Sequence, residues 1–254
     1  MAQMNQGAAC GRVSGLAWSG VRYFTTTRCG GASAGPFNSF NLGGHTGDDP
    51  ACVERNRRDL AQGLPDEPIW LAQVHGSAVL DADAWQGRGA PQADAAVTTR
   101  AGRVLAIMTA DCLPVVLADT GGRVLGVAHA GWRGLAGGVL ESTLDRMRLA
   151  CPDASGFRAW VGPGIGQRHF EVGADVLAAF AGRDADTRLF FAEKTPGEKW
   201  LADLASLARH RLCRAGVGDV ELSGYCTYGR PDLFYSYRRA GRTGRMATLA
   251  WLAA

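Results

Sequence analysis

Short runs of apolar and β-branched residues recur along the chain, and turn-forming residues separate them. Runs of this length that contain Val, Ile, Phe and Tyr are typical of strands, so the pattern predicts a protein rich in β-structure. The predicted strands are residues 21–26, 69–74, 93–99, 104–109, 114–118, 124–128, 157–161, 220–222 and 246–252.

Four other segments follow the period of a helix or carry helix-start signals. The first begins after Asp49, an N-terminal cap that is followed by Pro50 at the first helical position, and it extends to about Gln62. The other three predicted helices are residues 135–149, 173–180 and 201–214.

The order of these elements indicates the fold class. Residues 119–122, Asp-Thr-Gly-Gly, form a hairpin signal between two predicted strands, which argues against a purely parallel sheet. We therefore predict an α/β fold, with a single domain over residues 1–254 in which a mixed-sheet sandwich carries helices on its outside. We expect residues 1–18 to be a flexible N-terminal extension.

Composition narrows the classes of protein. The chain has 254 residues, 46% of them apolar, which is enough for a buried core. Its net charge of +3 is too small to indicate a nucleic-acid partner, and no apolar stretch reaches the ~18 residues that a membrane span needs. Seven cysteines without a Cys-x-x-Cys pair indicate a reduced, cytoplasmic location. The sequence specifies no oligomeric state.

Three segments at the ends of predicted strands carry side chains that bind metals or act as nucleophiles. Residues 73–76 (Gln-Val-His-Gly), 110–114 (Ala-Asp-Cys-Leu-Pro) and 128–134 (Ala-His-Ala-Gly-Trp-Arg-Gly) contribute His75, Cys112 and His129. Each of the three alone has a purely structural interpretation, and the set carries the argument. Two imidazoles and one thiolate leave a fourth tetrahedral position open, as in catalytic zinc sites.

Other residues near these segments have two interpretations each. Asp111 is a candidate acid or base, or a residue that orients a ligand histidine, and otherwise it is a turn residue. Arg133 is a candidate anion ligand, and otherwise it pairs on the surface with Glu141 or Asp145. The aromatic and arginine residues of 225–246 suit a planar ligand with oxygens, or form the edge of an aromatic core.

Taken together, the segments resemble the bacterial YfiH family. The members of that family have been called multicopper polyphenol oxidase or laccase-domain proteins, and are also described as purine nucleoside phosphorylases and as a peptidoglycan editing factor. The resemblance covers nearly the whole chain, through residues 35–43, 47–50, 56–58, 73–76, 110–112, 129–134, 162–166, 170–173, 234–239 and 244–246.

The resemblance implies a metal site on His75, Cys112 and His129, and an α/β sandwich like that of the cytotoxic necrotizing factor toxins. Asn41 and His45, in the N-terminal loop, and Gln73, in the segment of residues 73–76, become candidate substrate contacts. The chain departs from the pattern that we expect of many relatives at Gly44, where a bulkier residue is more usual, and this affects loop packing rather than chemistry.

The leading hypothesis is a zinc-dependent purine nucleoside enzyme. The resemblance implies phosphorolysis of adenosine, inosine and methylthioadenosine, and deamination of adenosine, with purine nucleoside and phosphate as the binding partners. Zinc with an open position can activate water for attack on adenine, and Asp111 is the candidate proton shuttle. A bound phosphate needs an arginine to hold its oxygens. The sequence does not rank the candidates, which are Arg57, Arg133, Arg238 and Arg245.

Three alternatives use the same residues. In a cysteine hydrolase that edits peptidoglycan precursors, Cys112 is the nucleophile and His129 or His75 is its base. In a copper-dependent polyphenol oxidase, copper replaces zinc, although five histidines are few for a multicopper cluster. A non-enzymatic protein that binds a nucleoside is the third alternative.

Overall fold

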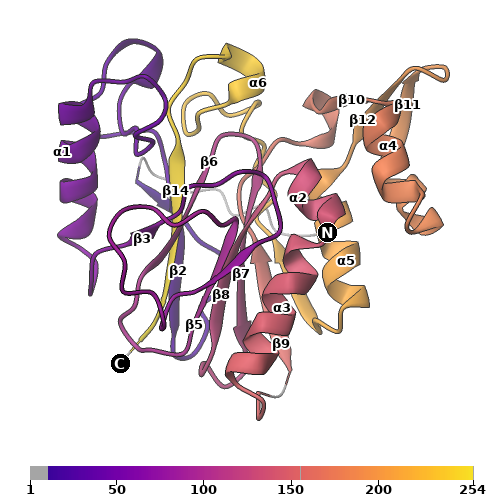
Figure 1. Ribbon diagram of the computed structural model, residues 1–254. Helices are drawn as coiled ribbons and strands as arrows, with labels where there is room; N and C mark the ends of the chain where they lie inside the picture. Colours follow the sequence, from indigo (N-terminus) through magenta and orange to yellow (C-terminus); the bar gives the residue numbers. More distant parts are fainter. Residues whose placement is uncertain (1–10, 155, 254) are drawn as a thin grey trace.

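Two β-sheets face each other in the centre of the molecule, and helices cover their outer faces (Figure 1). The computed structural model describes residues 11–154 and 156–253. The strands of the first sheet lie in the order β1 (Arg12–Val13), β2 (Val21–Thr26), β14 (Met246–Leu252), β6 (Leu105–Thr109) and β3 (Ile69–Trp70). β14 is antiparallel to β2 and β6, whereas β3 is parallel to β6.

The second sheet has six strands, four of which form an antiparallel centre. Its strands lie in the order β13 (Asp219–Leu222), β9 (Phe157–Val161), β7 (Leu113–Asp119), β8 (Leu125–Ala130), β5 (Ala95–Thr98) and β4 (Val79–Asp81). The two edge strands, β13 and β4, pair in parallel with their neighbours. Both large sheets are therefore mixed, as the sequence predicts.

The central strands are buried on both faces. In β7, alternate side chains belong to two different hydrophobic cores. Val116 and Ala118 point into the core between the two sheets, whereas Val115 and Leu117 point into the core under the helices. All four side chains are fully buried. A strand that is covered on both faces has a continuous apolar sequence rather than an alternating one, which is what this segment shows.

Helices form the two outer layers. α1 (Pro50–Ala61) covers the first sheet, where Leu60 packs with Phe24 and Leu249. As predicted, Asp49 caps this helix by accepting a hydrogen bond from the backbone N–H of Ala51. The second sheet is covered by α2 (Trp132–Gly137), α3 (Val139–Ala150) and α5 (Leu204–Arg214). No helix among the described residues has the length and apolarity needed to cross a membrane.

A small third sheet projects at one side of the molecule (Figure 1). Its strands are β10 (Glu171–Gly173), β12 (Lys199–Ala202) and β11 (Phe191–Thr195), and α4 (Ala174–Ala181) packs beside them. The sequence pattern does not predict β11, because its residues after Phe191 are exposed and carry no apolar alternation. The last helix, α6 (Tyr237–Ala240), is a single short turn that precedes β14.

Two predicted helices differ from the structure. The one predicted over residues 135–149 is two helices, because Gly138 adopts a left-handed conformation, with φ of 98°, that ends α2 and begins α3. The one predicted over residues 201–214 begins at Leu204, since the preceding residues pair as β12.

The predicted N-terminal extension is corrected in part. Residues 1–10 of it lie outside the described residues, but β1 pairs with β2, and Trp18 is buried against Tyr23. Residues 11–18 therefore belong to the folded part of the chain. The strand predicted over residues 69–74 also ends early, at Trp70, so that His75 lies in the loop that follows it.

Candidate metal centre

The ends of three strands and one loop meet at the same edge of the sandwich. The chain leaves β6 in the first sheet, passes through residues 110–112 and enters β7 in the second sheet, so Cys112 lies at the crossing point. His129 is the second-last residue of β8, where it pairs across the sheet with Pro114. The loop after β3 brings His75 to the same place.

The three side chains form a compact donor set. One ligand atom from each of His75, Cys112 and His129 lies within 4.8 Å of the others, and the two imidazole rings meet edge to face with centroids 4.8 Å apart. In a tetrahedral zinc site, bonds of about 2.0–2.3 Å place the donor atoms about 3.3–3.8 Å apart. The set therefore fits a zinc ion after the donor atoms close in by about 1 Å. It is the one such group among the residues that the structure describes.

Asp94, which the sequence analysis did not select, organises this set. Its carboxylate is fully buried and accepts a hydrogen bond from His129 Nδ1 at 2.8 Å. It also accepts the backbone N–H groups of Val74, His75 and Gly76 at 2.7–3.1 Å. One side chain therefore fixes the ring of one ligand and the backbone of another, and it leaves His129 Nε2 to face the centre.

Hydrogen bonding also determines the charge of Asp94. Burial alone would raise its pKa, but the hydrogen bonds from His129 and from the loop amides hold the pKa below the usual range of a carboxyl. The group is therefore a carboxylate at neutral pH. A ligand histidine whose second ring nitrogen donates to a carboxylate is a better metal donor.

Cys112 and His129 influence each other's charge. Burial alone would raise the pKa of the thiol and lower that of the imidazole. The attraction between the two groups, together with the interactions of His75 with the thiol and of Asp94 with His129, outweighs burial. The pKa of Cys112 therefore falls to about 6 and the pKa of His129 rises to about 9. Without a metal, the pair is a thiolate and an imidazolium at neutral pH. Since a metal needs the unprotonated imidazole, metal affinity increases with pH in this range.

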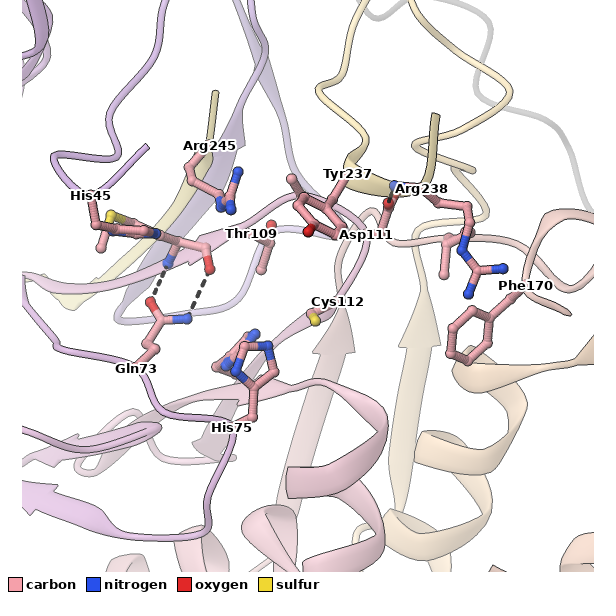
Figure 2. A pocket seen from close by; sticks show the side chains of 14 residues that line it. His45, Gln73, His75, Thr109, Asp111, Cys112, Phe170, Tyr237, Arg238 and Arg245 are labelled. Atoms are coloured by element: carbon pink, nitrogen blue, oxygen red, sulfur yellow. Dashed lines mark hydrogen bonds between the residues drawn. The ribbon is translucent and has the colours of Figure 1, made fainter. Parts of the chain in front are cut away.

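A pocket of about 480 Å³ opens directly over the donor set (Figure 2). This volume lies within the range of about 300–1,000 Å³ that is usual for small-ligand sites. The lining residues are His45, Gln73, His75, Met108, Thr109, Ala110, Asp111, Cys112, His129, Ile165, Phe170, Tyr237, Arg238 and Arg245. The pocket therefore combines metal donors, two arginines and two aromatic rings.

The structure places some predicted substrate contacts in the pocket and others outside it. His45, Gln73, Arg238 and Arg245 line it, as does the predicted proton shuttle Asp111. The three predicted contacts that do not line it are Asn41, Arg57 and Arg133.

The three residues outside the pocket have internal or surface roles. Asn41 is fully buried, and its amide oxygen accepts the backbone N–H groups of Gly43 and Arg245. Arg57 donates to the carbonyl of Leu42 and stacks over a tryptophan ring. Arg133 is exposed and lies over the ring of the neighbouring Trp132.

Gln73 and Asp111 line the pocket while they are bound to other groups. The Gln73 amide exchanges two hydrogen bonds of 2.8 Å with the backbone of Met108, and thus continues the pairing of β3 with β6 (Figure 2). The Asp111 carboxylate accepts hydrogen bonds from the hydroxyls of Thr227 and Ser236 and from the backbone N–H of Arg238. Asp111 therefore anchors the segment that carries Arg238.

Tyr237 belongs to the aromatic and arginine residues of 225–246, for which a planar ligand is one interpretation of the sequence. The pocket residues that the sequence does not single out are Met108, Thr109, Ala110, Ile165 and Phe170. The sequence does hold a signal for Asp94, because this carboxylate lies among apolar residues in a segment, 93–99, that is predicted to be a strand. A buried charge requires hydrogen-bond or ion-pair partners, so an acidic residue in an apolar strand is a candidate for a structural or functional role.

The fold and the donor set define a class: a two-sheet α/β sandwich with a His, His, Cys centre at the floor of a pocket. The family model described as multi-copper polyphenol oxidoreductase laccase matches residues 22–253. The chain belongs to this family, which includes YfiH.

Relatives and solved structures agree with this assignment. A purine nucleoside phosphorylase of Xylella fastidiosa is 50% identical over 245 residues, which cover 92% of this chain and 93% of the relative. Escherichia coli purine nucleoside phosphorylase YfiH is 45% identical, over 92% of this chain and 94% of its own length. The crystal structure of Neisseria meningitidis protein NMB0706 has a TM-score of 0.88 at 44% identity, covering 96% of this chain and 98% of its own.

Gly131 gives a test of how tightly the donor set is packed. A Cβ at this position would lie 2.9 Å from Cys112 Sγ and 3.1 Å from a carbon of the His75 ring, so Gly131→Ala must displace both ligands. We expect zinc affinity to fall at least about tenfold, because the added methyl group would keep Cys112 and His75 from closing on the ion at normal bond lengths. Gly131 precedes α2 and Gly137 ends it; a Cβ at Gly137 would meet nothing within 4 Å, so Gly137→Ala is the matched control. Equal zinc affinity of the two variants, in competition with a chromophoric chelator, would contradict this packing.

The charge state of Cys112 predicts its reactivity. In metal-free protein, alkylation of Cys112 by iodoacetamide should increase through pH 6, because the pKa of the thiol is about 6 rather than the usual ~8.5. Added zinc should protect it. The exposed Cys213 is the internal control and should react with or without zinc. Peptide mass mapping measures both sites, and a midpoint near pH 8.5 at Cys112 would show that the ion pair does not form.

Proposed function

We propose that the protein is a zinc-dependent purine nucleoside phosphorylase that acts on adenosine, inosine and methylthioadenosine and also deaminates adenosine. The observation that carries the proposal is the donor set of His75, Cys112 and His129 at the floor of a pocket of about 480 Å³. The names of the relatives in Xylella fastidiosa and Escherichia coli support a nucleoside and phosphate as its substrates.

The two reactions make different demands on the pocket. In phosphorolysis, an oxygen of phosphate forms a bond to C1′ of the ribose as the bond from C1′ to the purine nitrogen breaks, and the purine takes up a proton. In deamination, water adds at C6 of adenine and ammonia leaves. Both reactions need a bound purine and a proton carrier, and only phosphorolysis needs a site for phosphate.

The residues of the pocket can meet these demands. When bound, zinc supplies a Lewis acid with one open coordination position. Asp94 keeps His129 oriented toward the centre. The rings of Phe170 and Tyr237 offer apolar faces to a purine, and Asp111 is the candidate for proton transfer.

A product assay tests this function. Purified protein should convert adenosine to adenine only when phosphate is present, and to inosine also without phosphate. His75→Ala should lower kcat/KM for both by about 100-fold or more, because the open-site metal is lost. Chelation should have the same effect, and zinc but not copper should restore activity. Chromatography separates the products. The control is His210→Ala, at a half-buried histidine that pairs with Asp184 and does not line the pocket.

The outcomes of this assay are distinct. Loss of both products in His75→Ala and on chelation, with His210→Ala active, supports the metal-dependent reactions. No product from adenosine, inosine or methylthioadenosine with zinc-loaded wild-type protein would overturn the proposal.

One observation favours a second candidate, a cysteine hydrolase that edits peptidoglycan precursors. The lowered pKa of Cys112 and the raised pKa of His129 describe a thiolate beside an imidazolium, the arrangement of cysteine hydrolases. This function requires no metal. Turnover of a muramyl peptide that persists in chelator and is abolished in Cys112→Ala would support it over the nucleoside reaction.

A further inference from the structure

We propose that Arg245 and Thr109 form the oxyanion subsite of the pocket, where inorganic phosphate binds opposite the metal donor set. The proposal rests on the phosphorolysis proposed above, since it assigns the phosphate of that reaction to one place. It is drawn from three observations: the partners of the arginines, an unpaired buried hydroxyl, and the position of both groups on one wall.

The four arginines that the sequence offers are not equivalent. Arg57 and Arg133 do not line the pocket. Arg238 lines it at the exposed rim, where its guanidinium donates to the carbonyl of Glu171 and lies over the ring of Phe170. Arg245 is the remaining cation. Its guanidinium is partly buried, and burial lowers its pKa from the usual value, although an arginine remains charged at neutral pH.

Several N–H donors of the Arg245 guanidinium have no hydrogen-bond partner among the described residues. Its Nη1 donates to the carbonyls of Thr243 and Gly244, each at 3.0 Å. The donors on Nε and Nη2 make no hydrogen bond to any described residue, and no described carboxylate pairs with the guanidinium. A partly buried charge usually has an opposite charge beside it, and here a bound anion can take that place. The planar donors of arginine suit the oxygens of phosphate.

The side chain of Arg245 is also held in place. A Cβ on Gly43 would lie 2.8 Å from Arg245 Cγ, so the loop of residues 43–46 packs closely on the arginine stem. The backbone N–H of Arg245 donates to the buried amide oxygen of Asn41 at 2.8 Å. The predicted contact Asn41 thus acts on the pocket through Arg245. A side chain that is fixed before binding loses less conformational entropy when the ligand arrives.

Thr109 supplies the second observation. It is 1% exposed, it lines the pocket, and its hydroxyl oxygen makes no hydrogen bond to any described residue. A buried hydroxyl without a partner costs free energy, and such groups are rare in folded proteins. A phosphate oxygen would accept the hydrogen of this hydroxyl and remove the cost.

The two groups lie on the same side of the pocket. Thr109 of β6 pairs with Met246 of β14, and Arg245 is the residue directly before Met246 in the chain. Figure 2 shows Arg245 and Thr109 on the wall that faces Cys112 and His75, with Phe170 at the far end of the pocket. Phosphate on this wall would leave the end near Phe170 for the purine.

His45 completes the wall without adding charge. It lines the pocket on the same side as Arg245 (Figure 2). Burial and the positive charges of Arg245 and Arg57 lower the pKa of its imidazole, so the ring is neutral at neutral pH and remains able to donate one hydrogen bond. The positive charge on this wall is therefore that of Arg245, which the acidic groups of Cys112 and Asp111 attract without a direct salt bridge, and this makes the residue the anchor of the subsite.

The experiment measures the KM for phosphate and the KM for inosine separately, in zinc-loaded protein. Thr109→Val and Arg245→Lys should raise the KM for phosphate about 10- to 100-fold, as expected for loss of a hydrogen bond to a charged group, and change the KM for inosine less than about threefold. Thr109→Ser, which keeps the hydroxyl, should stay close to wild type. The matched control is Arg242→Lys, an exposed arginine on the same turn that does not line the pocket.

Phe170→Leu marks the other end of the pocket and should raise the KM for inosine while the KM for phosphate stays unchanged. A calorimetric titration of each variant with inorganic phosphate alone gives a readout that does not depend on turnover. If wild-type protein turns over nucleoside but Thr109→Val and Arg245→Lys keep wild-type affinity for phosphate, the proposed phosphate subsite is wrong and the proposed phosphorylase function is supported. If wild-type protein binds phosphate through both residues without turnover, the subsite stands and the proposed function fails.

Discussion

The buried carboxylate of Asp94 joins parts of the chain that are distant in sequence. It accepts four hydrogen bonds, three from the backbone of residues 74–76 and one from the ring of His129. A charge in the core is costly unless each lone pair finds a donor, and here the donors belong to the two segments that carry the histidines of the donor set. The requirement to satisfy Asp94 therefore also sets the position of the donor set. The loop accommodates it with a left-handed backbone at His75, where φ is 61°.

The sandwich explains why the donor set opens into a pocket rather than into the core. β6 and β7 belong to different sheets, and the crossing between them carries Cys112 to the edge where the sheets separate. The two walls of the resulting pocket differ in character. One has the metal donors, and the other has a single partly buried cation, Arg245, beside the unpaired hydroxyl of Thr109. An anion on the wall of Arg245 and Thr109, with a second, uncharged ligand beside it, would match this division.

The sequence was most informative where chemistry and strand ends coincide. His75, Cys112 and His129 each follow or end an apolar run, which marks them as one candidate donor set, and the structure brings one ligand atom of each within 4.8 Å of the others. Asp94 could not be singled out in the same way, because only the three-dimensional structure shows which donors surround it. Arg57 was predicted to contact substrate on residue type, but its guanidinium binds a loop carbonyl inside the fold. Local sequence also failed where tertiary pairing decides the structure, as in the exposed strand β11.

The most direct test of this account is the zinc dissociation constant of Asp94→Asn, measured by competition with a chromophoric chelator. The substitution keeps the size of the side chain and removes its charge, and the account predicts zinc binding that is about 10- to 100-fold weaker than in wild type. Asp119→Asn is the matched control, since Asp119 is equally buried and accepts backbone N–H groups in a turn that does not line the pocket. Unchanged zinc affinity in Asp94→Asn, in protein that remains folded, would contradict the central role of this carboxylate.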